Sequence, residues 1–250
     1  MKPAADRREA RSFVLYVEGA RDREILECWA RRIDPALPRC IVRNTVILGG
    51  RRPARAILDF EKRGGPGAGF SGLIVLDRDD RPGPVPATDA AAKGAGAARI
   101  PGPDEQPHRA ALDAGLEVFV WSLRHIESYL LVPDAIRRML GLARDDGRIE
   151  RLLQGASPGV GMPCEPGVGG TGRMPASLHA KRMLGPGGAL SRALGVELRP
   201  GEIARAMKPE EFHADVHRLF DRIGALSGLA RGGPEVVIRS AGPVARKTDS

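Results

Sequence analysis

The chain has 250 residues, of which 42% are hydrophobic, so it can bury a substantial core as one large domain or as one domain with a smaller helical part. It contains no run of 18 apolar residues and its first eleven residues are polar and charged, so we expect no membrane span, no secretory signal and a cytoplasmic protein. The cysteines, Cys28, Cys40 and Cys164, form no C-x-x-C pair, which argues against a disulfide framework and against a zinc site.

The formal net charge of +8 favours a polyanionic partner such as DNA or RNA. The preference is modest, because nearly all the basic residues are arginines in a chain rich in Ala, Gly and Pro, and a GC-rich coding sequence produces the same composition. Aromatic residues make up only 4% of the chain, so we do not expect a stacking platform for single-stranded bases.

The first 80 residues alternate between strand and helix patterns. An apolar run at 13–17 predicts a buried strand, and the following residues place Ile25, Leu26 and Trp29 on one face of a helix. The next predicted elements are a strand at 40–48, a helix at 53–63 and a strand that begins at Leu73. Strand and helix units in series predict parallel pairing with right-handed crossovers.

The rest of the chain predicts one further strand and then helices. Residues 81–107 and 155–175 are rich in Pro and Gly and lack an apolar period, so we expect a long loop or insertion in each place. We expect the tail from 230 to be poorly ordered, with a short edge strand at 236–238 as the alternative. The other predicted elements are a helix at 108–114, a strand at 116–121 and helices at 133–143, 148–154, 177–184, 188–194, 201–206 and 209–226. The predicted fold class is α/β, with a mostly parallel four-stranded sheet flanked by helices and a carboxyl-terminal helical part.

Two of the predicted strands end in carboxylates. Glu18 follows the first strand, and Asp77 and Asp79 follow the strand that begins at Leu73. The carboxyl ends of parallel strands form the usual ligand crevice of an α/β sheet, and the middle residue of a D-x-D points away from the outer two. Acids grouped there are costly unless they bind a cation, and Mg²⁺ prefers oxygen ligands. We therefore predict a magnesium site that includes Glu18, Asp77 and Asp79.

Gly19 and Asp22 extend the first acidic group. Gly19 has no side chain, which would let the chain turn sharply into the helix and let a phosphate or metal approach the backbone. Asp22 lies near the predicted helix start, where it could bind a second ion or cap the helix, and the sequence leaves both open.

These motifs resemble the Toprim domain of topoisomerases, bacterial primases and several nucleases. The resemblance lies in E-G-x-x-D at 18–22 and in D-x-D at 77–79, each after an apolar strand. A third segment, W-x-x-R-x-I-E-S-Y-L at 121–130, resembles the stretch that closes this region in OLD-type (overcoming lysogenization defect) nucleases and their stand-alone relatives in phage-defence loci. The implied fold is a Rossmann-like Toprim sheet. The implied domains are a catalytic Toprim domain at 12–132 with a loop or insertion at 81–107, a helical carboxyl-terminal subdomain at 133–228 with a flexible 155–175 loop, and a tail at 229–250.

The resemblance implies a nuclease that depends on Mg²⁺ or Mn²⁺ and cuts DNA or RNA. It makes Glu127 a candidate for a second ion, and the alternative is an exposed helix acid paired with Arg124. It makes Lys181 a candidate for stabilising charge on the phosphorus, and the alternative is a solvated surface lysine. The predicted catalytic residues are Glu18, Asp77, Asp79 and Lys181, and the predicted metal ligands are Glu18, Asp22, Asp77, Asp79 and Glu127.

Four nearby residues are expected to have lesser roles. Arg78 and Arg124 could contact phosphate, and His125 should lie beside the site, although a lone histidine is more often structural than catalytic. We expect Tyr129 to pack in the core with its hydroxyl at the surface and to have no catalytic role.

Three classes of function stay open on the sequence. The first is a metal-dependent nuclease, the second is another Toprim activity such as primer synthesis or ribosomal-RNA maturation, and the third is a nucleic-acid-binding component that acts only with a separate ATPase. No G-x-x-x-x-G-K-[ST] phosphate loop is present, whereas OLD-type nucleases carry an ATPase on the same chain. A topoisomerase is not expected, because the only tyrosines, Tyr16 and Tyr129, lie inside the Toprim-like region.

Overall fold

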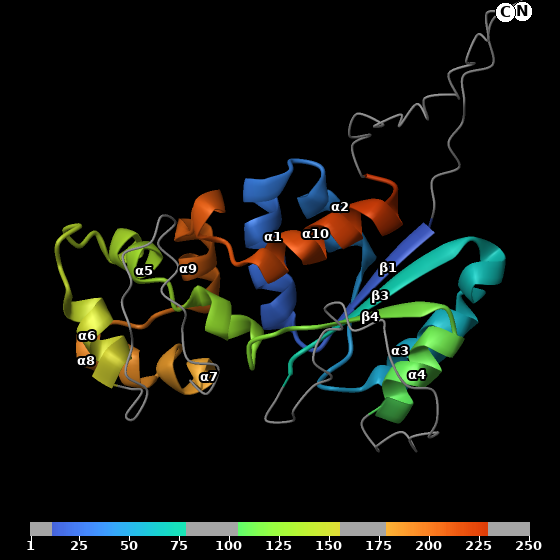
Figure 1. Ribbon diagram of the computed structural model, residues 1–250, viewed down its shortest axis with the longest axis horizontal. Helices are drawn as coiled ribbons and strands as arrows, with labels where there is room; N and C mark the ends of the chain where they lie inside the picture. The colour runs from blue at the N-terminus through green and yellow to red at the C-terminus, as the bar shows by residue number, and fades with distance from the viewer. Residues whose placement is uncertain (1–11, 79–104, 156–178, 230–250) are drawn as a thin grey trace, which may run out of the picture.

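The computed structural model describes residues 12–78, 105–155 and 179–229 (Figure 1). Within these residues, four strands form one sheet in the order β2-β1-β3-β4, and every pairing is parallel. The strands are β1 (Ser12–Val17), β2 (Thr45–Ile47), β3 (Phe70–Leu76) and β4 (Leu116–Val120). Leu15 of β1 lies opposite Leu73 of β3. Glu18 and Asp77, which follow these two strands, therefore lie at the same edge of the sheet and are offset by one residue.

Helices cover both faces of this sheet. Figure 1 shows α1 (Ala20–Ile33), α2 (Leu37–Asn44) and α10 (Ala214–Ser227) on one side and α3 (Pro53–Lys62) and α4 (Glu105–Asp113) on the other. Alternate strand residues point to opposite faces, so each strand contributes to two apolar clusters. The α1 side contains Leu15, Val17, Leu73 and Val75, and the α3 side contains Val14, Tyr16, Ile74 and Leu76. The predicted α/β class, with a parallel four-stranded sheet flanked by helices, is confirmed.

The predicted strand at 40–48 is wrong in its first part. Residues 37–44 form helix α2, and only Thr45–Ile47 pair with β1. Leu37, Cys40 and Ile41 are buried at helical spacing while Val42 is exposed, and a proline lies in the first turn. A short apolar run that fits the spacing of a strand and of a helix cannot be assigned by pattern alone. Here the segment packs against α1 as a helix.

The carboxyl-terminal part is helical, as predicted. Its helices are α5 (Pro133–Leu140), α6 (Arg148–Gly155), α7 (Ala180–Met183), α8 (Ala189–Leu194) and α9 (Pro200–Ala206). The chain also forms short 3₁₀ turns at η1 (Gly65–Ala68), η2 (Ile126–Leu130) and η3 (Pro209–Glu211). The predicted single helix at 209–226 is wrong, because it is split into η3 and α10. His213 interrupts it as the N-cap of α10, where its Nδ1 accepts a hydrogen bond from the Asp215 amide at 3.1 Å.

An aromatic cluster joins the sheet to this helical part. The indole of Trp29 on α1 makes edge or tilted ring contacts with Trp121, Tyr129 and Phe212. These rings belong to an apolar cluster that continues from β1 and β3 to α8 and α9. The helical part is therefore packed against the end of the sheet where Glu18 and Asp77 emerge.

Several predictions fall outside the described residues. These concern Asp79, Cys164, the loop over 81–104, the loop over 156–175 and the tail over 230–250. The last three residues of the predicted 81–107 loop are helical, because α4 begins at Glu105. No helix in the described ranges has both the length and the apolar character needed to cross a bilayer.

Candidate metal centre

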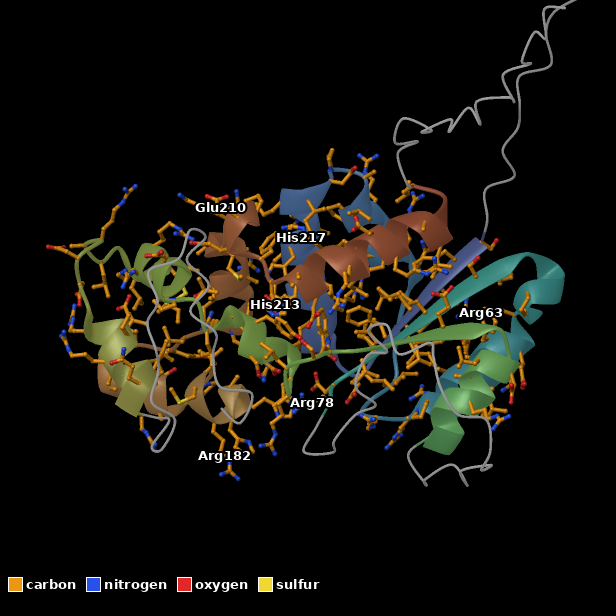
Figure 2. The ribbon with its side chains drawn as sticks, viewed as in Figure 1. Arg63, Arg78, Arg182, Glu210, His213 and His217 are labelled. Carbon is orange, nitrogen blue, oxygen red and sulfur yellow. The ribbon has the colours of Figure 1, made fainter. Side chains whose placement is uncertain are left out.

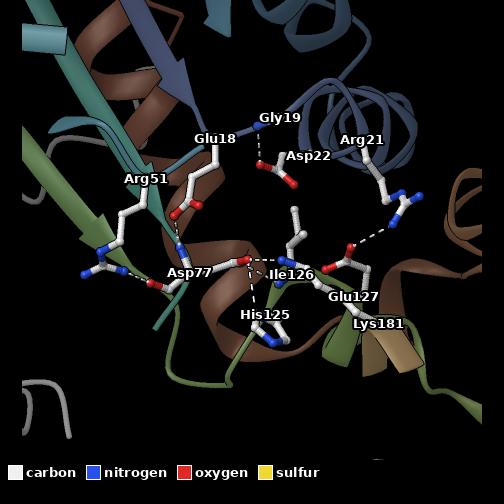
Figure 3. A network of polar contacts seen from close by, with 10 residues as sticks. All are labelled: Glu18, Gly19, Arg21, Asp22, Arg51, Asp77, His125, Ile126, Glu127 and Lys181. Atoms are coloured by element: carbon white, nitrogen blue, oxygen red, sulfur yellow. Dashed lines mark hydrogen bonds and ion pairs between the residues drawn. The ribbon is translucent and has the colours of Figure 1, made fainter. Parts of the chain in front are cut away.

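The first two predicted acids meet at the carboxyl edge of the sheet. Glu18 follows β1, Asp77 follows β3, and the Asp77 amide donates a hydrogen bond to Glu18 Oε1 at 3.0 Å (Figure 3). Because β1 and β3 are paired neighbours, this contact follows directly from the parallel topology. Asp79, the third predicted acid, lies outside the described residues.

The carboxylate of Asp77 is buried and well supplied with donors. Its side chain is 4% exposed; Oδ1 accepts from the Ile126 amide at 3.0 Å, and Oδ2 lies 2.8 Å from Lys181 Nζ and 3.3 Å from His125 Nδ1. Burial alone would lower the pKa of Lys181, but the bond to Asp77 and the charges of Glu127 and Asp22 raise it, so the ammonium stays charged. The structure therefore brings Lys181, from α7, to a strand-end acid 104 residues earlier.

Asp22 caps helix α1. Its Oδ2 accepts a hydrogen bond from the Gly19 amide at 2.8 Å, which realises one of the two roles that the sequence left open. Gly19 itself has φ −142° and ψ 169°, and an added Cβ would meet nothing closer than 3.8 Å. The chain therefore does not need glycine for this turn, contrary to the sequence argument, and the other predicted reason for Gly19, the approach of a ligand, is not tested.

Asp22 and Glu127 form a pair of poorly balanced acids: nearby cations and hydrogen-bond donors offset only part of their negative charge. Burial and the nearby charges of Asp77 and Glu127 together raise the pKa of Asp22 to about 6, because the Gly19 amide and Lys181 offset only part of their effect. Glu127 is 1% exposed, and its Oε1 lies 3.4 Å from the half-exposed Arg21. Its buried Oε2 has no hydrogen-bond partner among the described residues. An ionised oxygen in that position is costly unless a cation reaches it.

The alternative interpretation of Glu127 is wrong. Glu127 is neither exposed nor part of an ordinary helix, because it lies inside the buried 3₁₀ turn η2. Arg124, its expected partner, contacts the ring of His179 at the start of α7. Glu127 therefore points toward Asp22 and the start of α1, as Figure 3 shows.

The donor set fits a hard divalent cation in charge and in ligand type. Figure 3 shows Glu18, Asp22, Asp77 and Glu127 in one network of polar contacts beside the start of α1. In the part of the chain that the structure describes, no three His, Cys, Asp or Glu side chains already lie in an arrangement that could hold a metal ion. Mg²⁺ usually takes one or two carboxylates and completes its octahedron with water, so the unsatisfied Glu127 oxygen and the raised pKa of Asp22 are the features that fit it.

Three residues next to the site, His125, Tyr129 and Arg78, were also considered in the sequence analysis. His125 lies beside the site, as predicted, and is 8% exposed. Tyr129 packs in the core, but its hydroxyl is not at the surface: it accepts from the Leu123 amide at 2.9 Å and lies 2.5 Å from Asp215 Oδ2. Arg78 Nη1 donates to the Ser122 carbonyl at 2.7 Å, which positions this guanidinium next to the segment that contains His125.

Two further contacts were not predicted by any sequence pattern. The Arg51 guanidinium, from the turn between β2 and α3, donates to the Asp77 carbonyl oxygen. Asp215, at the start of α10, accepts hydrogen bonds from both Ser122 and Tyr129. Each contact joins residues far apart in the chain, and no local motif marks either residue.

The comparisons with known proteins provide a structural likeness only. No family model and no curated protein matches the sequence. The C-terminal region of the OLD protein of Xanthomonas campestris pv. campestris is similar in structure, with a TM-score of 0.41 and 14% identity over 87% of this chain and 96% of that chain for the iodine-phased structure. The platinum-phased structure of the same region gives 0.41, 15%, 88% and 95%. A likeness at this identity and TM-score indicates nothing about the activity of this chain.

Proposed function

We propose that this protein is a divalent-metal-dependent nuclease that hydrolyses phosphodiester bonds of DNA or RNA, in the manner of the OLD-type Toprim nucleases that its motifs resemble. The observation that carries this proposal is the pair of poorly balanced acids, Asp22 and Glu127, beside an acid that already has a cationic partner, Asp77 with Lys181. A site with excess buried negative charge and an adjacent lysine suits a metal ion and a phosphate together.

The protein's own residues have distinct roles in this proposal. Glu18, Asp22, Asp77, Asp79 and Glu127 would hold Mg²⁺ or Mn²⁺. When bound, such an ion acts as a Lewis acid on a phosphoryl oxygen and lowers the pKa of a bound water. The Ile126 amide and His125 fix the orientation of the Asp77 carboxylate. Lys181 would neutralise charge that develops on a non-bridging phosphate oxygen, because its side chain is 44% exposed and its ammonium stays charged.

Surface arginines near α7 would bind the nucleic-acid backbone. Figure 2 shows Arg78 and Arg182 on the same side of the molecule, toward its lower edge in that view, and Arg182 is exposed on α7 next to Lys181. Guanidinium contacts to phosphates carry no sequence information and weaken as salt rises. The proposed substrate is therefore recognised through its backbone.

The test is cleavage of a panel of labelled single- and double-stranded DNA and RNA with Mg²⁺ or Mn²⁺. We expect cleavage that stops in EDTA and falls by on the order of 10³-fold in Asp77→Asn, because that change removes one charge from the acid group at the strand ends. The matched control is Asp113→Asn, an exposed acid at the end of α4 on the opposite face of the sheet. Cleavage that persists in EDTA, or an Asp77→Asn protein as active as the control, would contradict the proposal.

A second candidate is a component whose activity depends on a separate ATPase. The observation that favours it is the ion pair between Lys181 and Asp77, which places a lysine on a proposed metal ligand and would have to rearrange before a metal reached that oxygen. Its test is to add the candidate ATPase with ATP to the same assay. Equal cleavage with and without the ATPase would exclude this alternative.

A further inference from the structure

Asp215 is a buried acid that belongs to no part of the proposed catalytic group. It lies in the first turn of α10 and is 1% exposed. Its Oδ2 accepts from the Ser122 amide at 3.3 Å, from the Ser122 hydroxyl, and from the Tyr129 hydroxyl at 2.5 Å, and its Oδ1 pairs with Arg218 one turn later on α10. A single carboxylate therefore gathers donors from two separate elements.

Two of the residues that Asp215 contacts, Ser122 and Tyr129, are the two ends of one segment. Ser122 follows β4 and Tyr129 lies in η2, and the Tyr129 hydroxyl also accepts from the Leu123 amide at 2.9 Å. Asp215 thus closes the 122–129 segment into a loop whose ends are fixed to α10.

The middle of the 122–129 segment supplies the contacts of the candidate metal centre. His125 Nδ1 and the Ile126 amide both contact the Asp77 carboxylate, and Glu127 places its charge beside Asp22. The Ser128 amide donates to the His125 carbonyl at 2.9 Å, which keeps the turn closed between the two ends. A change at the ends of the segment would therefore move three site residues together.

The Asp215 carboxylate is ionised where it lies. Burial alone would raise its pKa, but hydrogen bonds from Ser122, Tyr129 and Arg218 keep the pKa below its ordinary value. Burial, followed by the bond to Asp215, raises the pKa of Tyr129, so the phenol keeps its proton and remains a donor. A charged acceptor with neutral donors makes these hydrogen bonds stronger than neutral ones.

We propose that Asp215 is a positioning residue for the metal centre: through Ser122 and Tyr129 it holds His125, Ile126 and Glu127 against Asp77 and Asp22. This inference rests on the proposed function for its metal, but the geometry of the 122–129 segment is independent of it. Asp215 acts through other residues and touches neither metal nor substrate. Outer residues that orient metal ligands typically change metal affinity or activity by about 10- to 100-fold when removed.

The experiment compares Asp215→Asn with Asp221→Asn in the full chain. Asp221 lies on the same helix but is exposed, so its substitution changes the charge of α10 equally without touching the 122–129 segment. Tyr129→Phe is the milder second variant, because it removes the hydroxyl and keeps the packed ring. Three quantities are measured: Mn²⁺ affinity without nucleic acid, by electron paramagnetic resonance; amide hydrogen exchange of 122–130 in EDTA; and kcat and KM separately.

We expect Asp215→Asn to melt cooperatively, to bind Mn²⁺ about tenfold more weakly and to lose about tenfold in kcat with KM little changed. In the same variant the Ile126 amide should exchange faster, since its bond to Asp77 depends on the fixed segment. Tyr129→Phe should shift each quantity in the same direction by less, and Asp221→Asn should match the wild type.

The inference is overturned if folded Asp215→Asn, or Tyr129→Phe where the first variant does not fold, retains wild-type Mn²⁺ affinity and wild-type exchange at 122–130. A wild-type protein that binds no Mn²⁺ would instead overturn the proposed function. In that case faster exchange in Asp215→Asn still supports the positioning of the segment, and unchanged exchange overturns it.

Discussion

The two halves of the candidate metal centre treat their carboxylates in opposite ways. In the strand-end half, the buried Asp77 carboxylate receives backbone and side-chain donors and an ion pair from Lys181. In the helix half, Asp22 has a pKa raised to about 6, and Glu127 keeps a buried oxygen without a partner in the described part of the chain. Both halves are acidic, but the ion pair is closer in the first: Lys181 lies 2.8 Å from Asp77, whereas Arg21 lies 3.4 Å from Glu127.

This difference predicts which half is preformed and which half depends on a bound cation. Charges that are paired and hydrogen-bonded define a geometry, while charges that are buried and poorly balanced store a cost that a bound cation removes. The strand-end half should therefore behave as a preformed acid group, and the helix half as the part whose stability depends on an added metal.

Loss of the lysine that pairs with Asp77 should change activity the most. Lys181→Met should reduce cleavage by about 10²- to 10³-fold, the range for loss of one group that stabilises transition-state charge. The same variant should bind Mn²⁺ more tightly, because a positive charge no longer contacts Asp77 Oδ2. Cleavage rates and Mn²⁺ titrations measure the two effects.

Lys208→Met is the matched control for Lys181. Lys208 is exposed just after α9, and its ammonium lies 3.9 Å from Glu210 Oε1. If the two variants have equal activity, Lys181 is an ordinary surface lysine and does not stabilise transition-state charge.

Metal addition should stabilise the protein through the helix half. At a metal concentration of 100 times Kd the free energy of unfolding should rise by about 2.7 kcal/mol, and the melting temperature with it. Glu127→Gln should lose most of this gain, since it removes one of the two poorly balanced acids. Thermal unfolding with Mg²⁺, Mn²⁺ or EDTA gives the measurement, and a full gain in Glu127→Gln would remove Glu127 from the set of proposed ligands.

Without metal, neutralising one acid in each half should change stability in opposite directions. Glu127→Gln in EDTA should stabilise the fold by about 1 kcal/mol, because it removes a buried charge with one weak partner. Asp77→Asn should destabilise the fold by about 1 kcal/mol, since Lys181 and His125 lose their acceptor charge. Urea unfolding of both variants provides the comparison, and two changes of the same sign would show that the halves do not differ.

The sequence predicted the frame of the fold and the strand-end half of the site. Continuous apolar runs located the strands and helical stripes located most helices, and parallel topology then required Glu18 and Asp77 to meet. The pattern failed at 37–44, where a short apolar segment is compatible with both structures and packing against α1 selects the helix.

The contacts that complete the site depend on long-range packing. Lys181 reaches Asp77 from 104 residues away, and Asp215 reaches Ser122 from 93 residues away. A resemblance pointed to Lys181, but no local spacing marks Asp215, because its role comes from the donors that surround it in the fold. Such residues become visible only when the helices are placed against the sheet.

The metal-free protein should also show a weak pH dependence of stability that comes from Asp22. An unfolded aspartate has a pKa near 3.9, and the folded protein raises that of Asp22 to about 6, so the folded state binds this proton more tightly. The contribution of Asp22 to the free energy of unfolding is therefore fully present below about pH 4 and is lost as pH rises through about 6. Comparing wild type with Asp22→Asn in EDTA between these values should isolate a loss on the order of 1 kcal/mol, reduced by solvent screening of a partly exposed group. Equal slopes in the two proteins would mean that the helix half carries no excess charge at neutral pH, and the distinction between the two halves would disappear.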